Sequence, residues 1–371
     1  MKNFATLPFY VKLACVLFSL MSIGYLAIQA KEILSPLIFS CLFAILLLPL
    51  AAFFEKKLKF PRSFAAMTAV ILLLLAIGGM LYILATQLTD LASDWPQFQQ
   101  QLGKEIDSFQ NWITVRFHVN EARQLKYVRS AATDILSSGT AVVGATVLSL
   151  SSILLFLVFT FIYTFFFLFY RRLIMRFLES VFLDENKMMV HQIIEQVQYV
   201  IHKYIVGLLI EMAIVTTFVS MVLSLMGVKY ALFLGLVTGI FNLVPYVGIF
   251  TSLLLSTFIT FATAASGTKV LLVVITYLIT HLTDSNILLP LIVGSKVRIN
   301  ALVTVLGVVI GEMLWGIPGM FLSIPVIAVL KIIFDHVATL KPWGIILGDE
   351  DIKQNRLATR LMMNKRKSHR T

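Results

Sequence analysis

Two breaks containing proline and glycine interrupt long apolar runs in the C-terminal third of the chain, and they constrain its fold more than any other feature. The first is FNLVPYVG at residues 241–248, and the second is LWGIPGM at residues 314–320. Each lies within an apolar run of about thirty residues, although a helix needs only about twenty to cross a bilayer core. Proline removes a backbone donor and glycine permits unusual dihedral angles, so each run is predicted to bend. Irregular backbone at membrane depth must be buried in protein or line a watery cavity, so we expect both bends to line a pathway.

The residues predicted to form bends are prolines and glycines. Pro245 and Gly248 lie in the first break, Gly316, Pro318 and Gly319 lie in the second, and Pro290 lies between the two breaks, after Asp284 and Asn286.

Composition places the whole chain in a membrane. Hydrophobic residues make up 59% of the chain, charged residues only 13%, and the mean hydropathy is +0.91. These values are far more apolar than those of a soluble domain, so we predict an integral membrane protein. The net charge of +11 comes from short cationic blocks beside apolar segments, which favour topology signals and lipid contacts and argue against a nucleic-acid partner.

The sequence contains no pattern typical of an enzyme, a cofactor site or a metal site. The two cysteines, Cys15 and Cys41, both fall in expected membrane helices, which excludes a disulfide framework or a thiol-ligated metal. There is no phosphate-cradling loop of the Walker type, so transport driven by ATP hydrolysis in this chain is not expected. We predict a protein that is not an enzyme and has neither cofactor nor metal.

Hydropathy divides the chain into six expected parts. They are a transmembrane scaffold of three helices (1–89), an extracytoplasmic helical module (90–147), a fourth transmembrane helix (148–177), a cytoplasmic amphipathic helix (178–204), a transport core (205–335) and a basic cytoplasmic tail (336–371). Within them, Lys31, Glu32 and Pro36 mark a tight turn between the first two helices, and the fourth helix is expected to stop against Arg171. The predicted fold class is an all-α polytopic membrane protein.

Charge decides the expected topology. Basic blocks mark cytoplasmic loops, so both termini are predicted to be cytoplasmic. If each broken run is a re-entrant hairpin, Lys296, Arg298 and the basic tail all fall on the cytoplasmic side, as their charges require. This topology has about six full helices plus two hairpins, or about eight membrane segments. Two full crossings in each run would also place these charges on the cytoplasmic side, although arms of about sixteen residues are short for a membrane span.

The expected order in the core is a helix followed by a hairpin, repeated in opposite orientation. Inverted repeats with broken helices are a common construction of secondary transporters, whose sites lie near the bilayer midplane. We therefore expect a midplane site between the two broken hairpins.

Polar residues in these apolar segments are the candidates for that site. An ionised side chain at the bilayer centre costs at least about 2.5–3.5 kcal/mol, so such groups usually face a cavity or a partner. The candidates for a substrate or ion pathway are Asp284, Asn286, Glu312, Asn242, Glu211 and His281. Structural alternatives remain open: Asp284 could cap a helix break, Glu312 could pair with Lys331, and Asn242 could bridge the first bend.

Three strings connect the chain to a known family. NLVPYVG at Asn242–Gly248, TDSNILLPLIVGSKV at Thr283–Val297 and GEMLWGIPGMFLSIPVIAVLKI at Gly311–Ile332 occur in order. Together they resemble the autoinducer-2 exporter family of bacterial membrane permeases, and the layout of nearly the whole chain is similar. Ile249 and Ala301 depart from the family pattern, because proline is common at both places.

The resemblance implies a homo-oligomeric exporter of the inner membrane. Some relatives are linked to autoinducer-2, a quorum-sensing signal, and others to sodium or lithium exchange against protons. We therefore expect a secondary transporter that moves a small polar metabolite outward. One alternative is a Na⁺(Li⁺)/H⁺ antiporter on the same fold, and a second is a membrane scaffold that transports nothing.

Overall fold

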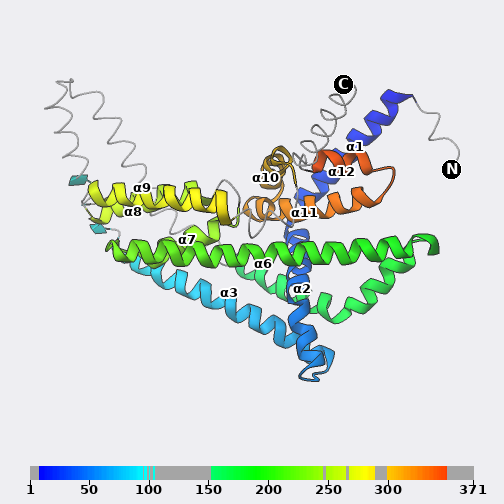
Figure 1. Cartoon of the computed structure of the whole chain (residues 1–371), viewed down its shortest axis with the longest axis horizontal. Helices are drawn as coiled ribbons and strands as arrows, with labels where there is room; N and C mark the ends of the chain where they lie inside the picture. The colour runs from blue at the N-terminus through cyan, green and yellow to red at the C-terminus, as the bar shows by residue number, and fades with distance from the viewer. Residues whose placement is uncertain are drawn as a thin grey trace, which may run out of the picture. The chain divides into compact units, whose positions relative to one another are not determined.

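A computed structural model describes residues 8–94, 152–244, 248–264, 267–288 and 299–348, with a few further positions between 96 and 104. Within these ranges every regular element is a helix (Figure 1). Seven of the helices are long and apolar enough to cross a membrane. The protein is therefore a multi-pass membrane protein, as composition predicted.

The N-terminal helices are α1 (Phe9–Gln29), α2 (Lys31–Lys56) and α3 (Arg62–Ser93). Our prediction of a turn containing Pro36 was wrong, because α2 begins at Lys31 and includes that proline. Membrane helices tolerate internal proline where neighbouring groups satisfy the freed carbonyl. The third helix continues past the expected boundary at residue 89, since the Asp94 amide still donates to the Asp90 carbonyl at 3.2 Å.

The next two long helices differ from the prediction. One helix, Ser152–Val181, continues through Arg171 instead of stopping there. Arginine is a good helix former, and Arg171 donates to Glu55 of α2 at 2.6 Å, which gives its charge a partner.

Helix α6 (Lys187–Leu225) follows the short 3₁₀ helix η1 (Asp184–Asn186). We expected a separate amphipathic helix at 178–204, and this was wrong: the 39 residues of α6 form one helix that continues past residue 204. No proline interrupts the segment. At 1.5 Å per residue α6 is about 58 Å long, roughly twice the thickness of a bilayer core. Part of α6 must therefore extend beyond that core.

Internal contacts divide the chain into two compact units. One comprises Met1–Lys31, Arg176–Tyr204 and Gly294–Thr371, and the other comprises Glu32–Met175 and Ile205–Val293. The break at residues 241–248 belongs to the unit that contains Ile205–Val293. The break at residues 314–320 belongs to the unit that contains Gly294–Thr371. We name them by their hairpins, the α7–α9 unit and the α10–α12 unit. The expectation of one site between the two hairpins stays a prediction.

In the α7–α9 unit, α7 (Ala231–Phe241), α8 (Gly248–Ala264) and α9 (Gly267–Thr283) pack successively on one another (Figure 1). Helix α7 also lies unusually close to α6. A Cβ atom added at Gly239 would be 2.8 Å from the carbonyl oxygen of Met212. Small residues allow membrane helices to approach in this way. The core beneath them includes Val219, Leu234 and Val273.

In the α10–α12 unit, α10 (Ala301–Trp315) and α11 (Ile317–His336) form a tight hairpin that continues into α12 (Lys341–Leu347) (Figure 1). Gly316 makes the turn with φ 68° and ψ −143°. We expected both arms of this run to be about sixteen residues, and for α11 this was wrong. With 20 residues, α11 is long enough to be a span, because its internal Pro325 does not end the helix.

Three expectations fall outside the described residues. They concern most of the extracytoplasmic module, the bend residues Pro245 and Pro290, and the basic tail after Gly348.

Candidate functional site

Three of the predicted pathway residues meet inside the α7–α9 unit, each from a different element. Glu211 lies in α6, Asn242 follows the last residue of α7, and Asp284 follows the last residue of α9. Asn242 Nδ2 donates to Glu211 Oε1 at 2.9 Å. The Asp284 carboxyl group lies close enough to interact with both the Glu211 carboxyl group and the Asn242 side chain. We call Glu211 and Asp284 the carboxyl pair.

The carboxyl pair is buried. Glu211 is 2% exposed and Asp284 is 6% exposed. Two carboxylates cannot donate to one another, so a hydrogen bond between these side chains would require that one of them carry a proton. Two neighbouring like charges in a poorly solvated place also repel, which favours the state in which the pair holds one proton.

Each member of the pair keeps one oxygen without a protein partner among the described residues. These atoms are Glu211 Oε2 and Asp284 Oδ1. Buried polar atoms in native proteins nearly always have a partner, which can be a protein group, a water molecule or an ion. The arrangement can therefore accept a small cationic or hydrogen-bonding ligand.

Local backbone geometry presents these side chains to one another. The Asn242 amide donates to the Thr238 carbonyl at 2.9 Å, so Asn242 completes the last turn of α7 just before the bend. At the end of α9 the helix widens into a π-helical turn over residues 284–288. Such turns are frequent at functional sites because they redirect side chains out of the regular helical register.

His281 and Asn286 border the carboxyl pair without joining its hydrogen bonds. His281 is close enough to interact electrostatically with Asp284, and its ring centroid lies 5.7 Å from that of Phe250. The side chain of Asn286 is exposed and donates to the Leu282 carbonyl at 2.8 Å. The side-chain amide of Asn286 is therefore hydrogen-bonded within its own helical segment.

Glu312 belongs to the α10–α12 unit, where its side chain is exposed. Our suggestion that it pairs with Lys331 was wrong, because Lys331 bonds to Asp335 at 2.6 Å, one turn further along α11. Gly319 packs so closely on α10 that an added Cβ would be 1.9 Å from the Gly311 carbonyl oxygen. Pro318 lies in the first turn of α11, where a proline costs no helical hydrogen bond.

In the first bend, Gly248 begins α8 against the end of α7. A Cβ added there would be 2.1 Å from the carbonyl oxygen of Phe241, so only glycine fits.

Comparison with known proteins decides the family. The model of the family described as AI-2E family transporter matches residues 13–339. The chain belongs to the AI-2E transporter family. This result confirms the resemblance read from the three strings, and it places the protein in a transporter family rather than an enzyme family.

Relatives of this AI-2E family transporter occur in several bacteria. YhhT of Escherichia coli K12 is 25% identical over 320 residues, which cover 86% of this chain and 89% of YhhT. YrrI of Bacillus subtilis is 36% identical over 138 residues, covering 37% of this chain and only 38% of YrrI. PerM of Escherichia coli K12 is 29% identical over 149 residues, covering 40% of this chain and 42% of PerM. The names of these relatives describe transport proteins and a permease.

The AI-2E family transporter also contains a buried hydroxyl cluster that our sequence reasoning missed. Tyr277 OH of α9 lies 2.6 Å from Thr238 Oγ1 of α7 and 2.6 Å from Ser256 Oγ of α8. All three residues are at most 1% exposed. The signal was present in the sequence, since Ser252, Ser256 and Thr260 recur every four residues along one helix.

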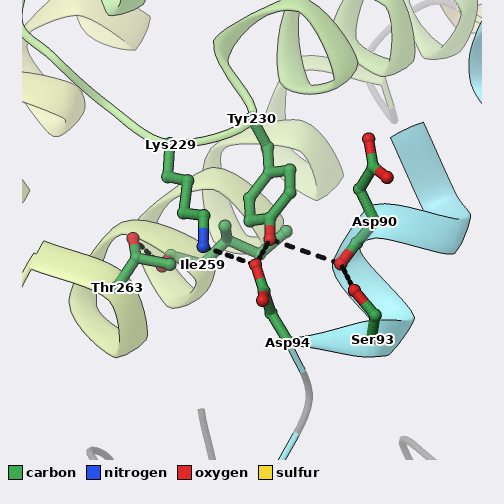
Figure 2. A network of polar contacts seen from close by, with 7 residues as sticks. All are labelled: Asp90, Ser93, Asp94, Lys229, Tyr230, Ile259 and Thr263. Carbon is green, nitrogen blue, oxygen red and sulfur yellow. Dashed lines mark hydrogen bonds and ion pairs between the residues drawn. The ribbon is translucent and has the colours of Figure 1, made fainter. Parts of the chain in front are cut away.

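A second polar network joins the end of α3 to the loop before α7 (Figure 2). Lys229 Nζ and Tyr230 OH both donate to Asp94 Oδ2. Tyr230 OH also lies 3.5 Å from the Asp90 carbonyl oxygen. The bonds from Lys229 and Tyr230 hold the pKa of the Asp94 carboxyl below its ordinary value, and the bond to Asp94 raises the pKa of Lys229.

Within the described residues, no three histidine, cysteine, aspartate or glutamate side chains gather as a metal site. The prediction of no metal-binding residues stays a prediction.

Proposed function

We propose that this AI-2E family transporter is a proton-coupled secondary transporter and that the carboxyl pair is its coupling site. The observation that supports the proposal is the proximity of Glu211 and Asp284, two buried acids from different elements that interact with one another. Ionisable groups inside membrane segments are expensive and commonly belong to ion pathways or proton relays.

The chemistry follows from the shared proton. With one proton the pair has a single negative charge and an internal hydrogen bond. Loss of that proton leaves two carboxylates side by side, which is unfavourable unless a cation enters or the helices separate. Proton release is thereby linked to the binding of another ion or to a rearrangement of α6, α7 and α9. Either consequence couples a proton gradient to movement of a solute.

The substrate that we propose is a small polar metabolite of the autoinducer-2 type, moved outward. The family description supports this choice. Asn242 adds an amide, which can donate to and accept from hydroxyl groups of such a molecule.

Na⁺ or Li⁺ exchange against protons is the second candidate. The free oxygens Glu211 Oε2 and Asp284 Oδ1 favour it, because hard monovalent cations prefer carboxylate and carbonyl oxygens.

We also propose that α7 and α8 form a re-entrant hairpin. At 1.5 Å per residue α7 is about 17 Å long and α8 about 26 Å, both shorter than a core of about 30 Å. The termini are proposed to be cytoplasmic in the inner membrane. Helix α1, which has no buried residue, is proposed to contact lipid or another copy in a homo-oligomer.

The test is a flux assay on purified protein in liposomes that contain a pH-sensitive dye. Wild type is compared with Glu211→Gln and Asp284→Asn while Na⁺, Li⁺, K⁺ or labelled autoinducer-2 is supplied. Glu185→Gln, an exposed acid in η1, is the matched control. Proton movement that is lost in the two pair variants and kept in the control would support the proposal. Solute-dependent proton movement that persists in both pair variants would refute it, and no movement of any solute in wild type would favour the scaffold alternative.

A further inference from the structure

We propose that buried hydroxyl groups of α8 and α9 form a hydrated track that leads to the carboxyl pair and carries its protons. The hydroxyl track consists of Ser252, Ser256 and Thr260 of α8 with Tyr277 and Thr280 of α9. Hydration of the track is independent of the proposed function, whereas proton delivery rests on it.

Spacing and burial put these hydroxyls on one continuous face of each helix. Ser252, Ser256 and Thr260 follow at intervals of four residues, so they share one side of α8. They are 1%, 1% and 0% exposed. Helix α9 repeats the interval, since Thr280, which is 3% exposed, stands four residues before Asp284 of the carboxyl pair.

The two faces meet, and their register leads to the carboxyl pair. Consecutive helices α8 and α9 run antiparallel, with Ser256 Oγ 2.6 Å from Tyr277 OH and the Phe250 ring against that of His281. Ser252 lies one turn before Ser256 in α8. In this antiparallel register, Ser252 is at the level of Thr280 in α9. Asp284 stands one turn further along, directly after the last residue of α9. From Thr260 to Ser252 the track extends about 12 Å along α8.

The direction of the hydrogen bonds can be deduced by counting protons. Thr238 Oγ1 donates its only proton to the Leu234 carbonyl oxygen at 2.6 Å, because a carbonyl can only accept. Thr238 must then accept from Tyr277. Tyr277 has spent its proton, so it accepts from Ser256. The oxygen of Ser256 keeps its capacity to accept a further hydrogen bond.

Two hydroxyls of the track have no protein partner within the described residues. They are Ser252 Oγ and Thr260 Oγ1. Serine and threonine in helices commonly donate to the carbonyl one turn earlier, and neither residue does so here. Buried polar groups that protein leaves unsatisfied are generally satisfied by ordered water. A water molecule beside Ser252 can accept its proton and donate to Ser256 Oγ.

From this geometry, water molecules occupy the track, and the track ends at the carboxyl pair. The hydrogen bonds that run from Ser256 through Tyr277 and Thr238 end at the Leu234 carbonyl oxygen, which cannot pass a proton on. Protons therefore pass along the water molecules beside Ser252 and Ser256. The titratable groups that adjoin this route are Tyr277, His281 and the carboxyl pair. Apolar residues such as Ile259 and Val273 surround it.

Cysteine labelling tests hydration. In the full chain with Cys15→Ala and Cys41→Ala, Ser252→Cys and Thr260→Cys are reacted in liposomes with a small water-soluble methanethiosulfonate. Ala262→Cys is the control, since Ala262 lies on the same helix, is 1% exposed and belongs to the apolar core. Both track cysteines are expected to react about tenfold faster or more than the control, because a thiolate forms only where water can solvate it. Reaction no faster than that of Ala262→Cys would overturn the proposal.

Flux measurements test delivery with variants that keep side-chain volume. Ser252→Ala and Thr260→Val are expected to slow proton uptake several-fold while the pH of half-maximal uptake stays the same, since the carboxyl pair is untouched. Unchanged uptake rates in both variants would overturn proton delivery. If Glu211→Gln and Asp284→Asn both keep wild-type flux, the proposed function fails, and the labelling experiment still decides whether the track is hydrated.

Discussion

Asn242 Nδ2 donates to Glu211 Oε1 at 2.9 Å, which ties the bend after α7 to the middle of α6. The two residues are 31 positions apart, and both are polar groups in apolar surroundings. Since Glu211 also interacts with Asp284, movement at the bend and the proton content of the carboxyl pair act on the same side chain.

Replacement of Asn242 by leucine tests that connection. Hydrogen bonds to charged groups contribute about 1.5–3 kcal/mol, so Asn242→Leu is expected to lower stability by that order and to reduce transport. Thermal unfolding in detergent and liposome flux provide the measurements. Asn286→Leu is the control, because Asn286 is exposed and bonds only within its own helix. Equal stability and flux for Asn242→Leu and wild type would show that the bond is unimportant.

The Asp94 network should make stability depend on pH. Hydrogen bonds from Lys229 and Tyr230 depress the pKa of Asp94 in the folded protein. A depressed carboxyl pKa gives stability that is present above the unfolded value of about 3.9 and is lost as pH falls through the folded pKa. Asp94→Asn should therefore lower the melting temperature at neutral pH and have less effect at the acid end.

The melting temperature of Asp94→Asn between neutral pH and pH 3 is compared with that of Asp90→Asn. The Asp90 carboxylate points away from the network, and only its backbone carbonyl takes part (Figure 2). A pH-independent difference between Asp94→Asn and wild type would contradict the assignment.

The approach of α7 to α6 predicts strong intolerance at Gly239. A Cβ there would lie 2.0 Å from Thr216 Oγ1 and 2.8 Å from the Met212 carbonyl oxygen, and backbone cannot yield as a side chain does. Gly239→Ala should destabilise the protein by about 1–3 kcal/mol. Gly78→Ala is the matched change, because no atom lies within 4 Å of a Cβ added there. Similar melting temperatures for both variants would argue against close packing.

The turn at Gly316 predicts a cost that arises from backbone conformation alone. Its φ of 68° with ψ of −143° is unfavourable for any residue with a Cβ, although no atom lies within 4 Å of the added carbon. Gly316→Ala should cost about 1–3 kcal/mol. Gly267→Ala, at an open glycine without positive φ, serves as the reference in thermal unfolding. Full tolerance of Gly316→Ala would mean that the hairpin can turn in another way.

Local patterns predicted some of these features well and others poorly. The break near Gly316 was readable because proline and glycine act on the backbone within a few residues. The continuous helix α6 was misread, because a change from amphipathic to apolar sequence alters the surroundings of a helix and not its hydrogen bonds. Pairing of Lys331 was also misread, because its partner Asp335 lies four residues along the same helix, a spacing at which ion pairs form locally and which we did not consider.

By itself, the sequence determined that this chain is a helical membrane protein of the AI-2E transporter family, with breaks in its apolar runs and acids within them. Those properties follow from hydropathy, from proline and glycine, and from motifs, all of which act locally. Only the tertiary structure decided that Glu211 and Asp284 meet while Glu312 lies in the other unit, and that hydroxyls of α8 face Tyr277. Such contacts depend on the register and close approach of helices distant in the chain, where a shift of one residue would turn each side chain by about 100°.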